Sequence, residues 1–286
     1  MIRFTVLLSF ILSSSAFALP LHQDITLKES PALAAVGNQY DFEGIIALNN
    51  CSGSLIKFTH SVPTDKAVVL TNGHCLADAF GGGMPKPGKV IVNENANRKI
   101  TILNPADGEG LGTVKATKII YASMTRTDVT FYELNKTYAE IEQSFQIKAL
   151  VLSDKQASVG EGMDIISGYW KRGYSCKIEA IVPTLKEAGW TMNDSIRYSR
   201  PGCEIIGGTS GSPIISQASG EVIGINNTMN EKGEKCTMNN PCEVDAQGTT
   251  THVKGYGYGQ QTFWFYTCLN ASKQLDLNTP GCLLAK

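Results

Sequence analysis

Short apolar runs, each bounded by residues that favour turns, recur along the chain from residue 44 onward. Runs of this length, separated by loops such as the glycine- and proline-rich stretch 81–88, favour an antiparallel barrel over helices that alternate with strands. The sequence therefore predicts an all-β fold. The predicted strands cover residues 44–48, 53–58, 67–70, 90–93, 99–103, 113–121 and 129–134, and then 149–152, 163–168, 176–182, 196–199, 214–216, 222–226 and 263–266.

The predicted strands fall into two groups, separated by the polar segment 135–145, which is expected to be a linker with a short helix. Two groups of regular strands indicate two antiparallel β-barrels that pack together. We expect the first barrel over residues 41–140. The second is expected over residues 141–286 and includes a disulfide-linked C-terminal tail.

The amino-terminal segment predicts export. Residues 1–18 combine Arg3, an apolar run over 4–12 and a small-x-small sequence that ends at Ala18, which is typical of a cleavable signal peptide. The apolar run is too short to span a bilayer comfortably. Residues 19–40 are polar and have no strong period, and we expect a propeptide or an N-terminal arm there. The protein is therefore expected to be secreted or periplasmic.

The cysteines and the charge balance narrow the functional class. An even number of cysteines in an exported chain indicates disulfide bonds, and a metal site is disfavoured because there is no Cys-x-x-Cys pair and there are only four histidines. A formal net charge of -1 gives no reason to expect nucleic acid or a membrane as a partner. We therefore expect a disulfide-bonded monomer without a metal or other cofactor. The eight cysteines are Cys51, Cys75, Cys176, Cys203, Cys236, Cys242, Cys268 and Cys282.

The segment 207–213 presents Ser210 between glycines on a tight bend flanked by isoleucines. Glycines leave room for a substrate and allow backbone N–H groups to converge on one point, as stabilisation of an oxyanion requires. The N–H groups of Gly208 and Ser210 are the candidate donors. Taken alone, the segment is equally typical of an ordinary turn between two strands.

Two further segments supply partners for a nucleophilic serine. His74 precedes a cysteine, and Asp128 opens an apolar run. Asp65 and Asp107 are alternatives to Asp128 in the same half of the chain, but Asp107 stands in a typical turn sequence. The remaining histidines are interpreted as surface residues: His22, His60 and His252.

The order His74, Asp128, Ser210, together with the local sequence around each residue, resembles the trypsin/chymotrypsin-like serine proteases. The resemblance implies a cleft between the two barrels in which His74 is the general base, Asp128 orients it and Ser210 is the nucleophile. It also implies a disulfide between Cys51 and Cys75, worth about 3 kcal/mol from loop entropy. The other pairs follow only from proximity in the sequence: Cys176–Cys203, Cys236–Cys242 and Cys268–Cys282.

Thr209 marks a departure from the trypsin pattern. Typical zymogens of that family carry an aspartate at this position, which pairs with a new amino terminus on activation, so we expect no such switch here. The Gly-Thr-Ser-Gly-Ser-Pro form looks more like the bacterial glutamyl-endopeptidase-like members.

By the same resemblance, the segments 203–206 and 224–228 are expected to shape the specificity pocket. Glu204 stands where trypsin-like enzymes carry the carboxylate that selects lysine or arginine, which favours basic substrates. Asn226 stands where glutamate-specific members commonly carry a histidine, which disfavours glutamate. Asn227 and Thr228 complete the expected substrate-binding residues.

The sequence thus predicts a secreted serine endopeptidase that acts on polypeptides through an acyl-enzyme. The alternative is a catalytically inactive homologue that serves as an extracellular binding module. Two stretches lie outside this scheme. The insert 230–247, with its two cysteines, is expected to be a surface loop that could contact substrate, and the glycine-rich aromatic stretch 254–266 is expected to close the second barrel as a strand and its turn.

Overall fold

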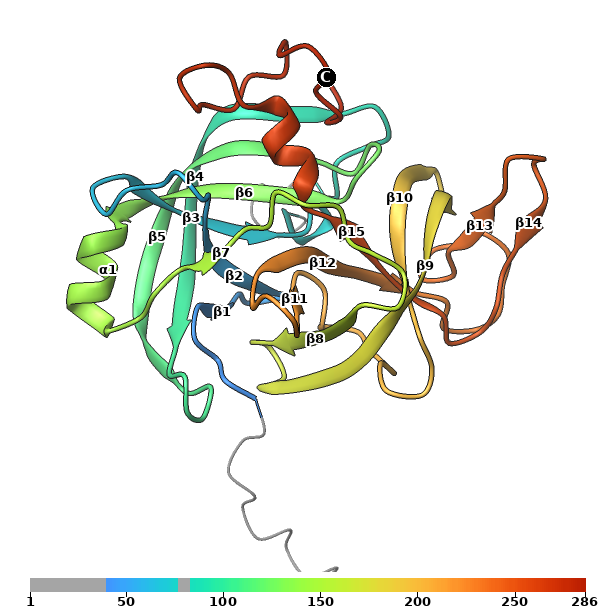
Figure 1. Cartoon of the computed structure of the whole chain (residues 1–286), viewed down its shortest axis with the longest axis horizontal. Coiled ribbons are helices and arrows are strands. Elements are labelled where there is room, and N and C mark those ends of the chain that lie inside the picture. The colour runs from blue at the N-terminus through green and yellow to red at the C-terminus, as the bar shows by residue number, and fades with distance from the viewer. Residues whose placement is uncertain (1–39, 77–82) are drawn as a thin grey trace, which may run out of the picture. The chain divides into compact units, whose positions relative to one another are not determined.

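The computed structural model of the protein describes residues 40–76 and 83–286 (Figure 1). The expected signal peptide and residues 19–39 of the expected arm lie outside the described residues, as does part of the loop 81–88. Within the described ranges, no helix has the length and apolar character needed to cross a membrane.

The first sheet closes into a barrel in the order β1-β4-β5-β6-β3-β2, because β1 pairs with both β4 and β2. A short seventh strand, β7, joins this sheet parallel to β2, so the sheet extends past the expected boundary at residue 140. The helix α1 (Tyr138–Phe145) lies between β6 and β7, as expected, and a capping box between Thr137 and Glu140 begins it. The strands are β1 (Ile45–Ala47), β2 (Ser52–Lys57), β3 (Lys66–Thr71), β4 (Val90–Leu103), β5 (Gly110–Ser123), β6 (Val129–Thr137) and β7 (Leu150–Val151).

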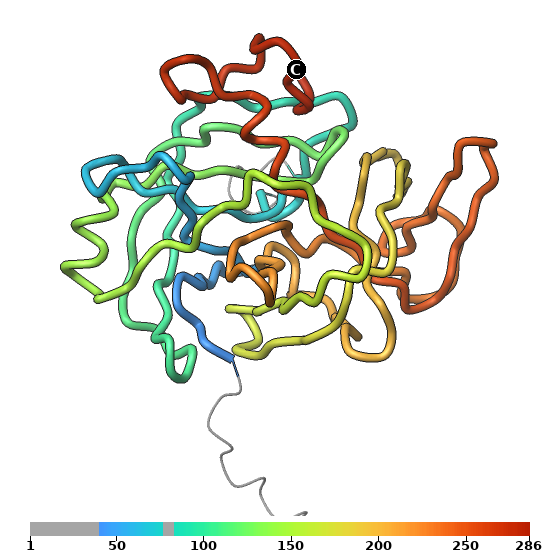
Figure 2. Tube along the Cα trace, viewed as in Figure 1, coloured from blue at the N-terminus to red at the C-terminus, as the bar shows by residue number. Residues whose placement is uncertain are grey.

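The second sheet closes in the order β8-β9-β10-β15-β12-β11, and β13 and β14 extend it from β9. Its pairings are all antiparallel, so the expected all-β fold of two antiparallel barrels is confirmed. In Figure 2 the first half of the trace, blue to green, lies mainly on the left, and the second half, yellow to orange, lies mainly on the right. The strands are β8 (Gly162–Ser167), β9 (Arg172–Glu187), β10 (Trp190–Tyr198), β11 (Pro213–Ser216), β12 (Val222–Met229), β13 (Cys242–Val244), β14 (Thr250–Thr251) and β15 (Gly257–Gln261).

Alternation along the strands of the first barrel fills two cores at once. In β3, Ala67 and Val69 belong to the cluster inside the first barrel, whereas Val68 and Leu70 belong to a second cluster on its outer face. Successive side chains of a strand point to opposite faces, so a continuous apolar run is buried on both sides. The outer cluster also includes Val222 and other residues of the second half of the chain, and it therefore packs the two halves together.

The expected strand over residues 263–266 is wrong. These residues lie in the 3-10 helix η2 (Phe263–Cys268), while the preceding glycine-rich residues form β15. Trp264 and Phe265 bury their rings in the outer cluster of the first barrel, and Phe265 packs edge-on against Phe131 at 4.0 Å between ring centroids. Packing of the aromatic rings against the first barrel thus outweighs their preference for strands. Figure 1 shows η2 in red beside the first barrel.

The strands β4, β9 and β10 are longer than their apolar runs predict. The two runs 90–93 and 99–103 belong to one strand, β4, because the polar residues between them still pair with β5 through a register shift. The hairpin of β9 and β10 also extends well beyond the predicted 176–182 and 196–199. Backbone pairing needs no apolar side chain, so a prediction based on apolar runs misses the polar parts of long strands.

Four disulfides are present, and they join the same pairs that proximity and resemblance suggested. Cys51–Cys75 ties β2 to the short 3-10 helix η1 (His74–Leu76), and Cys268–Cys282 holds the C-terminal tail. The tail returns to the first barrel, where Leu284 enters the outer cluster. The remaining bridges are Cys176–Cys203 and Cys236–Cys242.

Candidate active site

His74 and Asp128 form a two-point contact in the first barrel. Asp128 Oδ2 lies 2.7 Å from His74 Nδ1, and Asp128 Oδ1 accepts the backbone N–H of His74 at 3.0 Å. The side chain of Asp128 is only 2% exposed, whereas that of His74 is 22% exposed. The carboxylate therefore fixes both the position and the orientation of the imidazole, while the far edge of the ring stays open.

The local sequence explains how the two residues meet. Asp128 stands just before β6, and Asn72 donates from Nδ2 to its carbonyl oxygen at 2.9 Å. A side chain at Gly73 would collide with the carbonyl of Ser123 and lie 3.0 Å from Asp128 Oδ1, so only glycine permits this approach. Asn72 and Gly73 are thus needed to bring His74 and Asp128 together.

Ser210 lies on the bend that leads into β11 of the second barrel. The bend touches the first barrel, since the N–H of Ser52 donates to the Ser210 carbonyl at 2.8 Å. Gly211 has φ +83°, and a side chain there would collide with the Ser52 carbonyl. The Ser210 hydroxyl donates to the carbonyl of Asn227 at 3.3 Å, and no hydrogen bond joins it to His74 in the described part of the chain.

Several N–H groups at the bend have no acceptor. Among the described residues, the amides of Gly207, Gly208 and Ser210 donate no hydrogen bond, whereas Thr209 N donates to the Ile206 carbonyl at 3.1 Å. Trp170 Nε1 donates to the Gly207 carbonyl at 2.8 Å. In a trans peptide the C=O and the following N–H point in opposite directions, so Trp170 turns the Gly208 N–H away from its own ring.

Thr209 is held in place by a buried polar network formed by Asn226 and Tyr198. Asn226 Nδ2 donates to the Thr209 carbonyl at 2.9 Å and to its hydroxyl at 3.1 Å, and Asn226 Oδ1 accepts from Tyr198 at 3.0 Å. Asn226 is 1% exposed and does not line the pocket beside Ser210. Asn226 therefore lies outside the pocket, and its amide supports the bend.

Glu204 is also placed away from the pocket. Its side chain is exposed, and both carboxylate oxygens accept from the N–H of Gly202, at 3.3 and 3.2 Å. Glu204 is therefore not among the residues that line the pocket beside Ser210. The other two expected residues, Asn227 and Thr228, do line the pocket.

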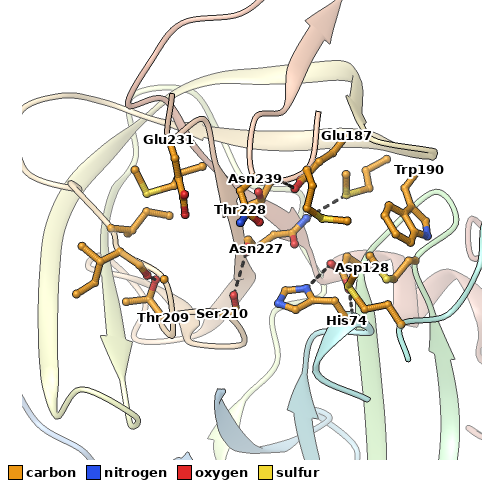
Figure 3. Close-up of a pocket in the computed structure, with 18 residues that line it drawn as sticks. His74, Asp128, Glu187, Trp190, Thr209, Ser210, Asn227, Thr228, Glu231 and Asn239 are labelled. Atoms are coloured by element: carbon orange, nitrogen blue, oxygen red, sulfur yellow. Dashed lines mark hydrogen bonds and ion pairs between the residues drawn. The ribbon is translucent and has the colours of Figure 1, made fainter. Parts of the chain in front are cut away.

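One pocket brings the candidate residues of the two barrels together (Figure 3). His74, Asp128 and Ser210 all line it, and the pocket is open to solvent, with about 630 Å³ of unoccupied space that includes its open mouth. Its walls are rich in methionine, an unbranched side chain that adapts to irregular shapes. Five of the seven methionines of the chain take part: Met84, Met124, Met192, Met229 and Met238.

The hairpin of β9 and β10 forms a wall of this pocket that the sequence did not indicate. Its tip docks on the first barrel, where Arg126 N donates to the Thr191 carbonyl at 2.9 Å and Asn193 N donates to the Arg126 carbonyl at 2.8 Å. Trp190 Nε1 donates to the Pro85 carbonyl at 2.8 Å. These bonds hold Glu187, Trp190 and Met192 over the cleft, and no local motif marks these three residues.

The insert 230–247 adds to the same wall. Its disulfide, Cys236–Cys242, and the pairing of β13 with β9 hold it beside the hairpin. Met238 and Asn239 line the pocket, and Asn239 N donates to Glu187 Oε1 at 2.8 Å. The insert is therefore a built part of the cleft.

Burial and charge shift the pKa values of two residues in the pocket. Burial, the largest single effect, lowers the pKa of His74, but the charge and hydrogen bond of Asp128, with help from Glu187, raise it above the usual 6.5. Burial raises the pKa of Glu187 above its usual 4.5, against hydrogen bonds from Thr228 and Asn239 and the attraction of His74. The surroundings of His74 thus stabilise the protonated form of its imidazole.

One group of candidate metal ligands lies beside the pocket. Cys51, His74 and Cys75 are the one group of three candidate ligands that lie close together among the described residues. The two sulfurs form a disulfide, so they are not available as thiolate ligands.

A buried arginine secures the segment that carries His74. Arg98 is 6% exposed and donates from Nη1 to the Cys75 carbonyl at 2.6 Å and to the Tyr132 hydroxyl at 3.2 Å. Its Nη2 donates to the side-chain oxygens of Asn49 and Asn50. One guanidinium therefore joins β4 to both ends of the Cys51–Cys75 loop.

Replacing Arg98 with methionine is expected to lower the free energy of unfolding by about 2–4 kcal/mol, because buried acceptors lose their donor. Lysine at this position is expected to recover only part of the loss, since an ammonium group cannot reproduce the planar fork. Urea denaturation measures the effect, with the exposed neighbour Lys99→Met as the matched control. Equal stability of the two methionine variants would contradict the role of Arg98.

The chain matches a known protein family. The model of the trypsin-like peptidase domain matches residues 51–225, which is more than half of the 286-residue chain. No match is found among curated protein sequences.

Several solved structures are similar to the chain. The Rv3671c protease of M. tuberculosis, in an inactive form, is 14% identical over 76% of this chain and 83% of that chain, with a TM-score of 0.45. The MamO protease domain from Magnetospirillum magneticum is 11% identical over 78% and 94%, with a TM-score of 0.45. A Glu endopeptidase in complex with MPD is 14% identical over 77% and 85%, with a TM-score of 0.44. On the extent of the family-model match, the chain belongs to the trypsin-like peptidase family.

Proposed function

We propose that the protein is an exported serine endopeptidase that cleaves polypeptides through Ser210, His74 and Asp128. The observation that carries the proposal is that the His74–Asp128 pair from the first barrel and Ser210 from the second line one pocket. Four disulfides and a signal-like amino terminus support export to a periplasm or beyond the cell.

In the proposed reaction, the Ser210 hydroxyl leaves the Asn227 carbonyl by rotation about its Cα–Cβ bond and donates to His74 Nε2. As Oγ attacks the peptide carbonyl, its proton passes to His74, and the proton then passes to the leaving amine. The leaving amine departs and the acyl group stays on Ser210 as an ester. Water then attacks this ester while His74 takes the proton of the water and returns it to Ser210 Oγ, which releases the acid product. The charge of Asp128 stabilises the imidazolium, in line with the raised pKa of His74.

The N–H groups of Gly208 and Ser210 are proposed to stabilise the oxyanion. Donors that already point at the developing charge lower the barrier because they need no reorganisation. Support comes from their lack of acceptors within the described chain and from the bond between Trp170 and the Gly207 carbonyl. Asn227 and Thr228 are proposed to bind the substrate backbone along the end of β12.

A fluorophosphonate tests the proposal directly, because it phosphonylates a serine only where a base and an oxyanion site are assembled. Intact mass spectrometry of the purified mature protein should show one adduct, which is absent from Ser210→Ala. No adduct on folded wild-type protein would contradict the proposal and favour the inactive binding module. The mass of the unreacted protein also locates the mature amino terminus.

Replacing Trp170 with phenylalanine is expected to lower kcat roughly 2- to 10-fold with little change in KM, since the ring remains but one hydrogen bond is lost. The split between kcat and KM is the informative readout, because the Gly208 N–H acts on the transition state. The adjacent Tyr169→Phe is the matched control: its ring packs edge-on against Trp170, and its hydroxyl forms no hydrogen bond among the described residues. A rise in KM alone would show that Trp170 only shapes the pocket.

A further inference from the structure

Glu187 is a buried carboxylate that the proposed chemistry does not use. It ends β9 and lines the same pocket as His74, Asp128 and Ser210, yet it is only 8% exposed. Figure 3 shows Glu187 and Trp190 on the His74 side of the pocket, and Glu231 and Thr209 on the opposite side. The carboxylate therefore faces the space into which a substrate must enter.

No fixed cation neutralises this carboxylate. Among residues 40–76 and 83–286, no lysine or arginine forms an ion pair with Glu187, and the segment 77–82 contains neither residue. Its hydrogen-bond donors, the N–H of Asn239 and the side chain of Thr228, are neutral. A buried charge without a counter-ion is costly, so a cation that enters the pocket gains a strong and directed contact.

The surroundings of Glu187 suit a long side chain with a charged end. Trp190 and Met192 come from the same hairpin and line the same pocket, as do Met84 and Met124 from the first barrel. Lysine and arginine bury their aliphatic stems against such apolar surfaces, and an indole face also attracts a cation. The bond from Trp190 to Pro85 and the docking of the hairpin on Arg126 hold this wall in place.

We propose that Glu187 binds the cationic side chain of a lysine or arginine in the polypeptide substrate, and that it makes basic residues near the scissile bond a determinant of cleavage. This inference rests on the proposed function. It assigns the basic preference to the hairpin wall, whereas the sequence suggested Glu204. The basic side chain enters from the side of the pocket that carries His74.

Cleavage of a peptide library of known sequence tests the proposal. Mass spectrometry of the products should show lysine or arginine enriched about 10-fold or more at one position near the cleaved bond, as a charge-assisted contact implies. Glu187→Gln, which keeps the shape and the acceptor for Asn239, should reduce that enrichment to less than about 3-fold. The matched control is Glu231→Gln, which removes an exposed carboxylate from the opposite side of the same pocket and should keep the preference. Equal cleavage of basic and neutral sequences by the wild type would overturn the proposal, as would a preference that survives Glu187→Gln.

A binding measurement separates this proposal from the proposed function. The same library is passed over immobilised Ser210→Ala and over Ser210→Ala/Glu187→Gln, neither of which needs to be catalytic. Retention of basic peptides by the single variant only would support the role of Glu187 even if the wild type took up no fluorophosphonate. An adduct at Ser210 without selective retention would leave the proposed peptidase standing and overturn the role of Glu187.

Discussion

Replacing Ser210 with alanine is expected to lower kcat/KM for polypeptide substrates by about 10⁴- to 10⁶-fold. The change removes the atom that is proposed to form the acyl bond. Ser212 is fully buried and donates to the Thr209 carbonyl at 2.7 Å, so its hydroxyl serves the bend. The remaining activity would come from the oxyanion donors and from substrate binding alone.

The stability of the variant should change little, which separates chemistry from folding. Ser210 loses only the 3.3 Å hydrogen bond to Asn227, and its hydroxyl is not fully buried. We therefore expect free energies of unfolding, measured by urea denaturation, that agree to within about 1 kcal/mol, together with the loss of activity in a steady-state assay. Activity within 10-fold of the wild type would show that Ser210 is not the nucleophile.

Replacing Asp128 with asparagine is expected to lower kcat by about 10⁴-fold near neutral pH. The backbone N–H of His74 requires an acceptor from residue 128, so the amide oxygen takes that place. The amide nitrogen then faces His74 Nδ1, 2.7 Å away in the native pair, and can only donate to it. The imidazole is forced to carry its proton on Nε2, where it cannot accept the proton of Ser210.

The pH dependence gives a second readout of the same variant. In the wild type, activity should fall as the pH drops through the pKa of His74, which lies above 6.5 because Asp128 and Glu187 favour the protonated ring. Loss of the Asp128 charge lowers that pKa, so the acidic limb should move to lower pH. Asp107→Asn, an exposed turn carboxylate that accepts from Glu109 N at 2.8 Å, is the control and should change neither quantity. An acidic limb that stays in place in Asp128→Asn would contradict the coupling.

The local sequence was sufficient to predict most of the strands and the three candidate catalytic residues beside them, His74, Asp128 and Ser210. Turn residues, polar segments and short apolar runs are short-range signals, and they predicted the two barrels, a short helix within the linker 135–145 and the bend at Ser210. The apolar run of β3 predicted a strand, whereas its burial on both faces, in two cores, is seen only in the packing of the two halves of the chain. Where packing acted against local preference, as in the aromatic run 263–266, the prediction failed.

The walls of the pocket could be decided only by the tertiary structure. Glu187 and Trp190 face the cleft because the tip of their hairpin binds Arg126 and Pro85. Glu204 turns away from it because its carboxylate binds Gly202. The contacts that dock the hairpin join residues far apart in the chain, and a carboxylate at the end of a strand looks the same in a sequence whether it faces solvent or a substrate. The order of His74, Asp128 and Ser210 was therefore visible in the sequence, whereas the charge that faces a substrate beside them depends on how separate loops pack.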